Sequence, residues 1–179
     1  GCTIIDQSKR RATHSAADAG AGYVAGHFTR MKGRAFAFVL KADDGREFTM
    51  PLGEDSTLPT EVKDQTVAIK VPPGQYTVVR WITYATLTRE VTSRQPIGST
   101  SVLGRPFAVQ PAGVIHLGSY DLSHYTQGGY PVITTHLRIQ PRRATQSQVQ
   151  RAFAETYPNL AALPLRCVLC ASLAGPGSP

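Results

Sequence analysis

The chain has 179 residues, of which 41% are hydrophobic, so it can bury one core and is too short for two. Its longest apolar runs, such as 35–40 and 78–82, are far below the roughly 18 to 20 residues of a membrane-spanning helix, so we expect no transmembrane helix. The formal charge of +7 favours acidic partners such as phospholipid headgroups, lipopolysaccharide or nucleic acid.

Basic residues cluster at two places, Lys9-Arg10-Arg11 and Arg142-Arg143. Neither cluster is interleaved with the aromatic side chains that a single-strand binding groove uses. We therefore expect a solvated, mildly basic surface and no nucleic-acid partner. The first cluster is well placed to lie near an anionic membrane.

The chain begins Gly1-Cys2-Thr3, and residues 1–19 form a polar run without apolar periodicity apart from Ile4 and Ile5. In bacterial lipoproteins a small residue precedes the cysteine whose thiol and freed amine carry the lipid. This pattern predicts lipidation at Cys2 followed by a flexible basic tether. The alternative is that Gly1 is a remnant of cloning beside an arbitrary cysteine.

From about residue 20 the pattern changes to the period of two that is typical of strands. In 35–40 the side chains of Phe36, Phe38 and Leu40 share one face, and Asp43-Asp44-Gly45 predicts a hairpin turn into 46–52. Pro72-Pro73-Gly74 predicts a sharp turn. The expected strands are 23–29, 35–40, 46–52, 65–71, 76–84, 101–109, 114–122 and 132–139.

The convincing helix comes late in the chain. Thr145 with Gln148 three residues later resembles a capping box, and Val149, Phe153 and Tyr157 continue at helical spacing until Pro158. Short strands, Gly/Pro turns and one helix predict a mainly β fold, namely an antiparallel β-sandwich of about seven to nine strands with one peripheral C-terminal helix. The domain is expected at 20–160, and 161–179 is expected to be a Pro/Gly-rich tail.

The remaining cysteines, Cys167 and Cys170, lie near the C-terminus. With Cys2 lipidated, these two are free to pair. A zinc site would need two further ligands at suitable spacing, and a redox motif would need a strand-to-helix junction. We therefore expect either a local disulfide or two idle thiols.

Several motifs occur in a familiar order along the chain. They are 22–26 (GYVAG), 36–38 (FAF), 71–76 (VPPGQY), 106–113 (PFAVQPAG) and 115–119 (IHLGS). This order resembles a group of poorly characterised bacterial lipoproteins with one immunoglobulin-like or prealbumin-like sandwich, and the proline-glycine-x-tyrosine turn looks like carboxypeptidase regulatory-like modules. The resemblance implies export, lipid anchoring and a non-catalytic envelope role, and it carries over no catalytic residues.

The sequence lacks the common catalytic signatures. There is no Gly-x-Ser-x-Gly elbow and no phosphate-binding loop, and the acidic residues fall mainly in predicted turns. His27, His116, His124 and His136 could converge on a metal, but His116 alternates with Ile115 and Leu117, and His136 shares a strand face with Thr134 and Arg138. We therefore expect His116 and His136 to be ordinary surface histidines, and we expect no metal and no cofactor. A glycan hydrolase stays as the less favoured alternative.

The segment 123–131 is predicted to be a loop rich in tyrosine and glycine. Tyr125, Gly128, Gly129 and Tyr130 have the composition of recognition surfaces and are our candidate partner-binding residues. The competing interpretation places Tyr120 in the core and packs the other two tyrosines over the end of the sandwich.

The function expected from the sequence is a non-catalytic envelope lipoprotein, anchored through Cys2, that binds or scaffolds in the periplasm or at the cell surface. Thr3 lacks the aspartate that retains some lipoproteins at the inner membrane, so the outer membrane is the first choice. The alternative is a secretion-system or toxin-immunity lipoprotein that binds one protein partner through 123–131 or an exposed strand edge.

Overall fold

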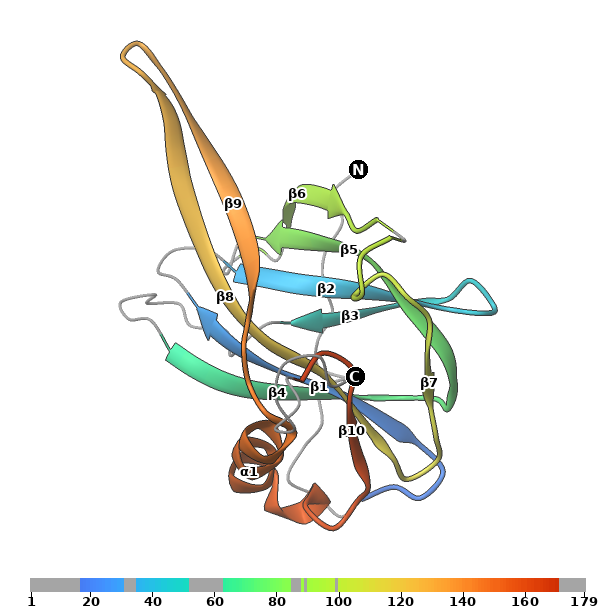
Figure 1. Ribbon diagram of the computed structural model, residues 1–179. Helices are drawn as coiled ribbons and strands as arrows, with labels where there is room; N and C mark the ends of the chain where they lie inside the picture. The colour runs from blue at the N-terminus through green and yellow to red at the C-terminus, as the bar shows by residue number, and fades with distance from the viewer. Residues whose placement is uncertain are drawn as a thin grey trace.

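The computed structural model describes residues 17–30, 35–51, 63–84, 88, 90–98 and 100–170. Within these residues the protein is mainly β, with two five-stranded sheets and one α-helix (Figure 1). The predicted lipid site Cys2, the tether up to residue 16 and residues 171–179 lie outside the described residues. The helix of the described part is shorter than a bilayer-spanning segment requires.

The first sheet has the order β10-β8-β1-β4, with β9 also paired to β8. Its strands are β1 (Gly22–Arg30), β4 (Lys63–Val71), β8 (Val114–Gly129), β9 (Val132–Arg142) and β10 (Leu165–Cys167). The second sheet has the order β3-β2-β5-β6, with β7 paired to β5. Its strands are β2 (Ala35–Ala42), β3 (Glu47–Pro51), β5 (Gly74–Tyr84), β6 (Val91–Pro96) and β7 (Phe107–Val109).

The sheets are mostly antiparallel, but the expectation of purely antiparallel pairing is wrong. β8 runs parallel to β1 on one side and to β10 on the other. All five strands of the second sheet lie between β1 and β8 in the chain, together with β4. Because that connection is long, β8 can enter the first sheet in either direction, and the side-chain alternation of a strand is the same in both.

The described strands also outnumber the seven to nine that were expected. β6 was missed because its residues are polar and mostly exposed, and it is held by its backbone ladder with β5 rather than by burial. The predicted strand at 101–109 is reduced to β7, since residues 101–105 turn. There the backbone at Gly104 passes so close to Gly98 that a side chain at Gly104 would lie 2.2 Å from its carbonyl oxygen.

Two turns follow the sequence prediction. Asp43-Asp44-Gly45 joins β2 to β3 as a hairpin, with Gly45 at φ +89° and the Asp44 carboxylate accepting the Arg46 amide at 3.0 Å. Pro72-Pro73 separates β4 from β5, which belong to different sheets. The turn at the prolines therefore carries the chain from one sheet to the other.

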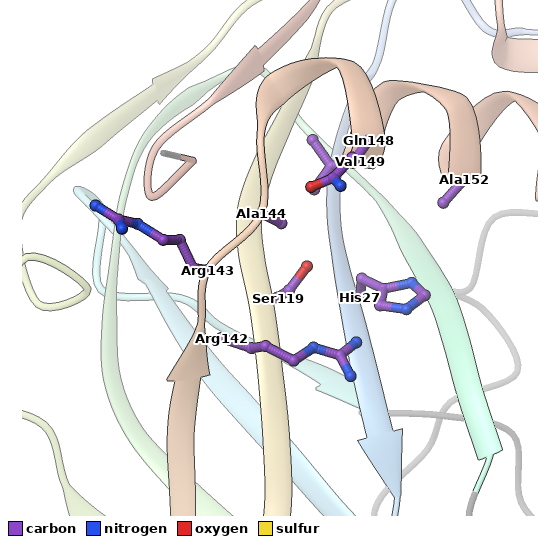
Figure 2. Close-up of a pocket in the computed structure, with 8 residues that line it drawn as sticks. All are labelled: His27, Ser119, Arg142, Arg143, Ala144, Gln148, Val149 and Ala152. Carbon is purple, nitrogen blue, oxygen red and sulfur yellow. The ribbon is translucent and has the colours of Figure 1, made fainter. Parts of the chain in front are cut away.

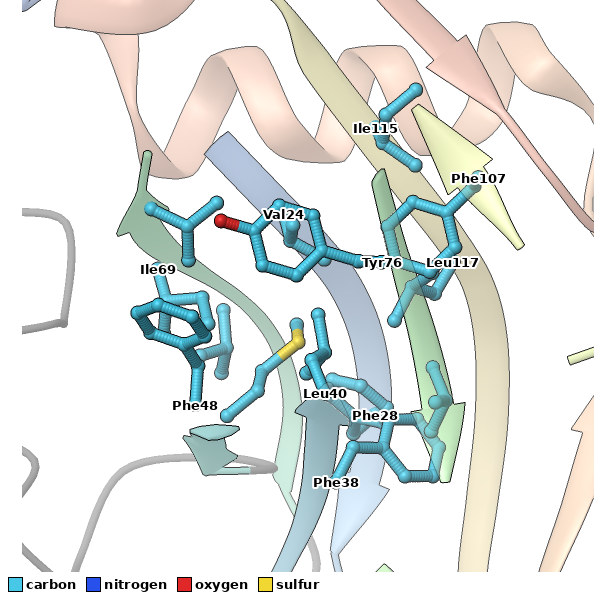
Figure 3. Packing of buried hydrophobic residues seen from close by; sticks show 14 of the residues in the cluster. Val24, Phe28, Phe38, Leu40, Phe48, Ile69, Tyr76, Phe107, Ile115 and Leu117 are labelled. Atoms are coloured by element: carbon cyan, nitrogen blue, oxygen red, sulfur yellow. The ribbon is translucent and has the colours of Figure 1, made fainter. Parts of the chain in front are cut away.

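The main core cluster draws side chains from strands of both sheets (Figure 3). Phe36, Phe38 and Leu40 of β2 are at most 1% exposed and belong to this cluster, as their alternation predicts. Phe38 meets Phe28 of β1 and Tyr120 of β8 edge-to-face, with ring centroids 5.8 and 5.6 Å apart. These three rings connect the two sheets through their aromatic contacts.

The helix α1 (Gln146–Thr156) begins with the predicted capping box. The Thr145 hydroxyl accepts the Gln148 amide at 3.2 Å, and the Gln148 side chain accepts the Thr145 amide at 2.9 Å. Val149 and Phe153 are buried against the first sheet, and α1 contacts β4, β8 and β10. After the helix, the Tyr157 hydroxyl accepts the amide of Ala68 in β4 at 3.2 Å, which fixes the end of the helix on the sheet.

The predicted boundary between domain and tail at residue 161 does not coincide with a structural boundary. The short 3-10 helix η1 (Pro158–Leu160) leads into β10, which extends the first sheet along β8. Directly after β10 the structure joins Cys167 and Cys170 by a disulfide, with Cα atoms 5.5 Å apart. Residues 161–170 therefore belong to the folded unit.

Candidate functional site

The segment expected to be a loop at 123–131 is for the most part strand. β8 continues to Gly129 and β9 starts at Val132, so only Tyr130 and Pro131 form the turn. The expectation was wrong because glycine and tyrosine are common in recognition loops, whereas here each residue up to Gly129 pairs with a residue of β9. The result is a long hairpin whose outer part projects away from the two sheets (Figure 1).

The pairing of β8 changes along its length. From Ser119 to Asp121 it pairs with β1 on one side and with β9 on the other, whereas from Leu122 to Gly129 the described pairing is with β9 alone. We call this outer part, residues 122–139, the arm. Between Leu122 and Ile139 the sequence contains no aspartate or glutamate. The arm is thus a two-stranded ribbon without carboxylates.

The tip of the arm is strongly exposed. Tyr130 has 95% of its surface accessible and Val132 has 69%, and Gly128 and Gly129 are exposed as well. Gly128 adopts φ +88°, and a side chain there would lie 2.8 Å from the Val132 carbonyl oxygen. The exposed side chains of Tyr130 and Val132 are apolar surface that the fold itself does not bury.

The predicted binding residues are therefore only partly brought together. Gly128, Gly129 and Tyr130 meet at the tip, whereas Tyr125 lies lower in the arm, where its backbone pairs with His136. The side chain of Tyr125 lies outside the described part of the chain. Tyr130 does not pack over the end of the sheets, and Tyr120 fills the core as the competing interpretation expected. The Tyr120 hydroxyl donates to the Leu117 carbonyl at 2.6 Å, and burial raises its pKa.

The expectation that His116 is a surface residue is wrong, because its side chain is completely buried. The polar face of β8 at this position does not meet solvent, since β10 pairs with β8 at Cys167 opposite His116 and α1 packs on both strands. His116 Nδ1 accepts the Gly118 amide at 3.0 Å. Burial, with a smaller effect from His27, lowers the pKa of His116 to about 3.

The other three histidines do not join His116. His27 in β1 is half-buried, with Nδ1 3.0 Å from the Thr66 hydroxyl. His124 and His136 lie in the arm, where the backbone of His124 pairs with Leu137, and their side chains lie outside the described part. Among the described residues, no group of three or more His, Cys, Asp or Glu is placed to hold a metal ion.

A pocket of about 280 Å³ lies beside the helix start (Figure 2). Its lining combines polar and cationic side chains with the apolar side of α1: His27, Ser119, Arg142, Arg143, Gln148 and Val149. Sequence reasoning noted Arg142-Arg143 as a charge cluster but could not connect it with His27, more than a hundred positions away. The pairing of Ser119 with both His27 and Arg142 brings them together.

Comparisons with known proteins identify no family. No family model matches the chain, and no curated protein resembles it significantly. Among solved structures, the chain is similar to a leucine-rich repeat protein from Bacteroides thetaiotaomicron VPI-5482, with a TM-score of 0.38 and 15% identity over 60% of this chain. The match spans only 13% of that much longer chain.

Proposed function

We propose that this chain is a non-catalytic lipoprotein of the bacterial outer membrane, anchored through Cys2, that binds an envelope protein through the tip of the arm. In this proposal the two sheets form a β-sandwich around the shared core, and the tether holds the sandwich near the membrane surface. The observation that carries the binding role is the exposure of Tyr130 and Val132 at the end of a projecting hairpin.

The physical argument starts from the energetic cost of such an arm. A two-stranded ribbon is only marginally stable by itself, and an exposed strand edge invites pairing with other chains. A partner protein that covers the tip would bury the tyrosine ring, a residue type that is enriched where binding energy concentrates. Because the arm lacks carboxylates, the complementary partner surface is neutral or acidic.

This arm also favours the more specific candidate among envelope lipoproteins, namely one that recognises a single protein partner, as secretion-system and toxin-immunity lipoproteins do. A projecting hairpin presents few side chains at its tip, and a small contact of this kind fits one complementary pocket. A general structural role would not need an exposed tyrosine at this position.

Binding through the tip predicts a sharp effect of Tyr130→Ser. Removing the ring should weaken capture of the partner by about 2 kcal/mol or more, roughly thirtyfold. The measurement is quantitative pull-down from envelope extract with the protein as bait, followed by titration of the recovered partner. Val102→Ser is the matched control, because Val102 is 42% exposed on a different segment.

The outcome that contradicts the binding role is equal recovery of the partner by wild type and Tyr130→Ser. Equal losses of partner binding in Tyr130→Ser and Val102→Ser would also contradict it, because they would indicate non-specific hydrophobic binding by exposed apolar residues rather than recognition by the tip.

Lipid anchoring predicts an all-or-none result. When the protein is produced from its natural gene in its own host, labelled palmitate should enter the wild type and be absent from Cys2→Ser, and only the wild type should float with membranes. Cys170→Ser is the control that removes a different thiol. An unmodified native Cys2 would end the anchoring proposal and leave the arm's role to be judged on partner capture alone.

A further inference from the structure

We propose that the pocket between β1, β8, β9 and α1 is a binding site for a phosphomonoester group. Nothing in the lipid-anchoring or arm-docking proposals requires this site, which lies at the base of the hairpin rather than at its tip. The argument rests on the charge of the lining and on its division into polar and apolar sides.

The described lining is cationic and contains no carboxylate. Figure 2 shows the guanidinium of Arg142 extending toward the imidazole of His27, with the Ser119 hydroxyl between their strands, whereas Arg143 points away from them. A guanidinium offers five N–H donors in a planar fork that matches phosphate oxygens. Arg142 is therefore the side chain that would carry most of the recognition.

Neighbouring groups hold these donors in place. Arg142 Nη1 lies 3.4 Å from the Asp121 carboxylate, a contact that orients the side chain. Gln148 accepts the Thr145 amide through its side-chain oxygen, so its remaining group is an NH₂ donor. Both contacts restrict side chains of the pocket before a ligand arrives, which lowers the entropic cost of binding.

The opposite side of the pocket is apolar. Val149 and Ala152 of α1 line it, and the volume of about 280 Å³ is near the lower limit of small-molecule sites, about 300 to 1,000 Å³. A free oxyanion would use only the polar side. A phosphate joined to a short carbon chain would use both, and for this reason the structure assigns the site to a phosphomonoester.

The test is a calorimetric titration of the folded protein with glycerol 3-phosphate at about 0.15 M salt, a concentration that screens non-specific attraction. We expect saturable binding with a dissociation constant below about 1 mM and no binding of glycerol. Arg142→Gln should weaken binding by about tenfold or more, and Ser119→Ala by a smaller factor. Arg151→Gln is the matched control, because Arg151 lies exposed on α1 and does not line the pocket.

Vesicles distinguish a lipid headgroup from a soluble ligand. If vesicles containing phosphatidic acid bind the wild type but not Arg142→Gln, the phosphomonoester comes from a lipid; if glycerol 3-phosphate alone binds, it is a free metabolite. Absence of saturable binding to either would overturn the proposal. Equal weakening by Arg142→Gln and Arg151→Gln would overturn it too, because it would reveal attraction to net charge.

Discussion

Replacing Phe38 by alanine is expected to lower the free energy of unfolding by about 3 to 5 kcal/mol. Phe38 is completely buried and meets the rings of Phe28 and Tyr120 edge-to-face. The substitution leaves a cavity where the two sheets meet and removes two aromatic contacts at once. Since a domain of this size is stable by about 5 to 15 kcal/mol in total, the loss is a large fraction of its stability.

The measurement is urea unfolding followed by tryptophan fluorescence, which Trp81 provides. Val102→Ala is the control, because this valine is 42% exposed and should change the free energy of unfolding by less than about 0.5 kcal/mol. A loss below about 1 kcal/mol for Phe38→Ala would show that Phe38 does not connect the sheets as the structure places it.

Acid is expected to destabilise the protein through His116. Burial lowers the pKa of His116 to about 3 in the folded state, against about 6.5 in the unfolded chain. As the pH falls, the unfolded state therefore takes up the proton before the folded state does. The contribution of neutral His116 to the free energy of unfolding is fully present above pH 6.5 and is lost as the pH falls toward 3. At about 1.4 kcal/mol per pH unit, the loss between pH 6.5 and pH 4 is about 3 kcal/mol.

The variant that isolates this effect is His116→Gln, which is neutral and does not titrate. Its free energy of unfolding should depend less on pH than that of the wild type between pH 4 and 6.5. His27→Gln is the matched control and should retain most of the His116 contribution, because burial is the larger cause of the lowered His116 pKa and His27 the smaller one. Parallel pH profiles for the wild type and His116→Gln would show that His116 does not account for acid sensitivity.

Local signals in the sequence were sufficient wherever a few neighbouring residues decide the conformation. Gly45 at a positive φ closes the predicted hairpin, the prolines at 72 and 73 separate two strands, and Thr145 caps the helix. In each case the deciding interaction joins residues no more than about four positions apart, so composition and spacing contain the required information.

The errors concern positions where distant parts of the chain meet. His116 has the alternation of a surface residue, yet β10 and α1 cover it. Residues 123–129 have the composition of a loop, yet β9 pairs with them throughout. A three-residue strand such as β10 has too few side chains to show a periodic sequence pattern. It is a strand because its backbone pairs with β8.

Of the two candidate sites, the sequence indicated one and only the tertiary structure revealed the other. The sequence directed attention to Gly128, Gly129 and Tyr130 through their composition, but the projection of the arm comes from the end of the β1 ladder at Asp121. The pocket needed the tertiary structure entirely, because Ser119, His27 and Arg142 come from three strands.

By itself, the sequence determined the β class, the turn at Pro72-Pro73, the capped helix and the core face of β2, because alternation and capping act between near neighbours. Only the tertiary structure decided the parallel pairing of β1 with β8, the burial of His116 and the meeting of Arg142 with His27. The physical reason is that a strand can satisfy its backbone hydrogen bonds against either neighbouring strand and in either direction, with only a small difference in stability. The choice is made by packing among residues that the sequence keeps far apart.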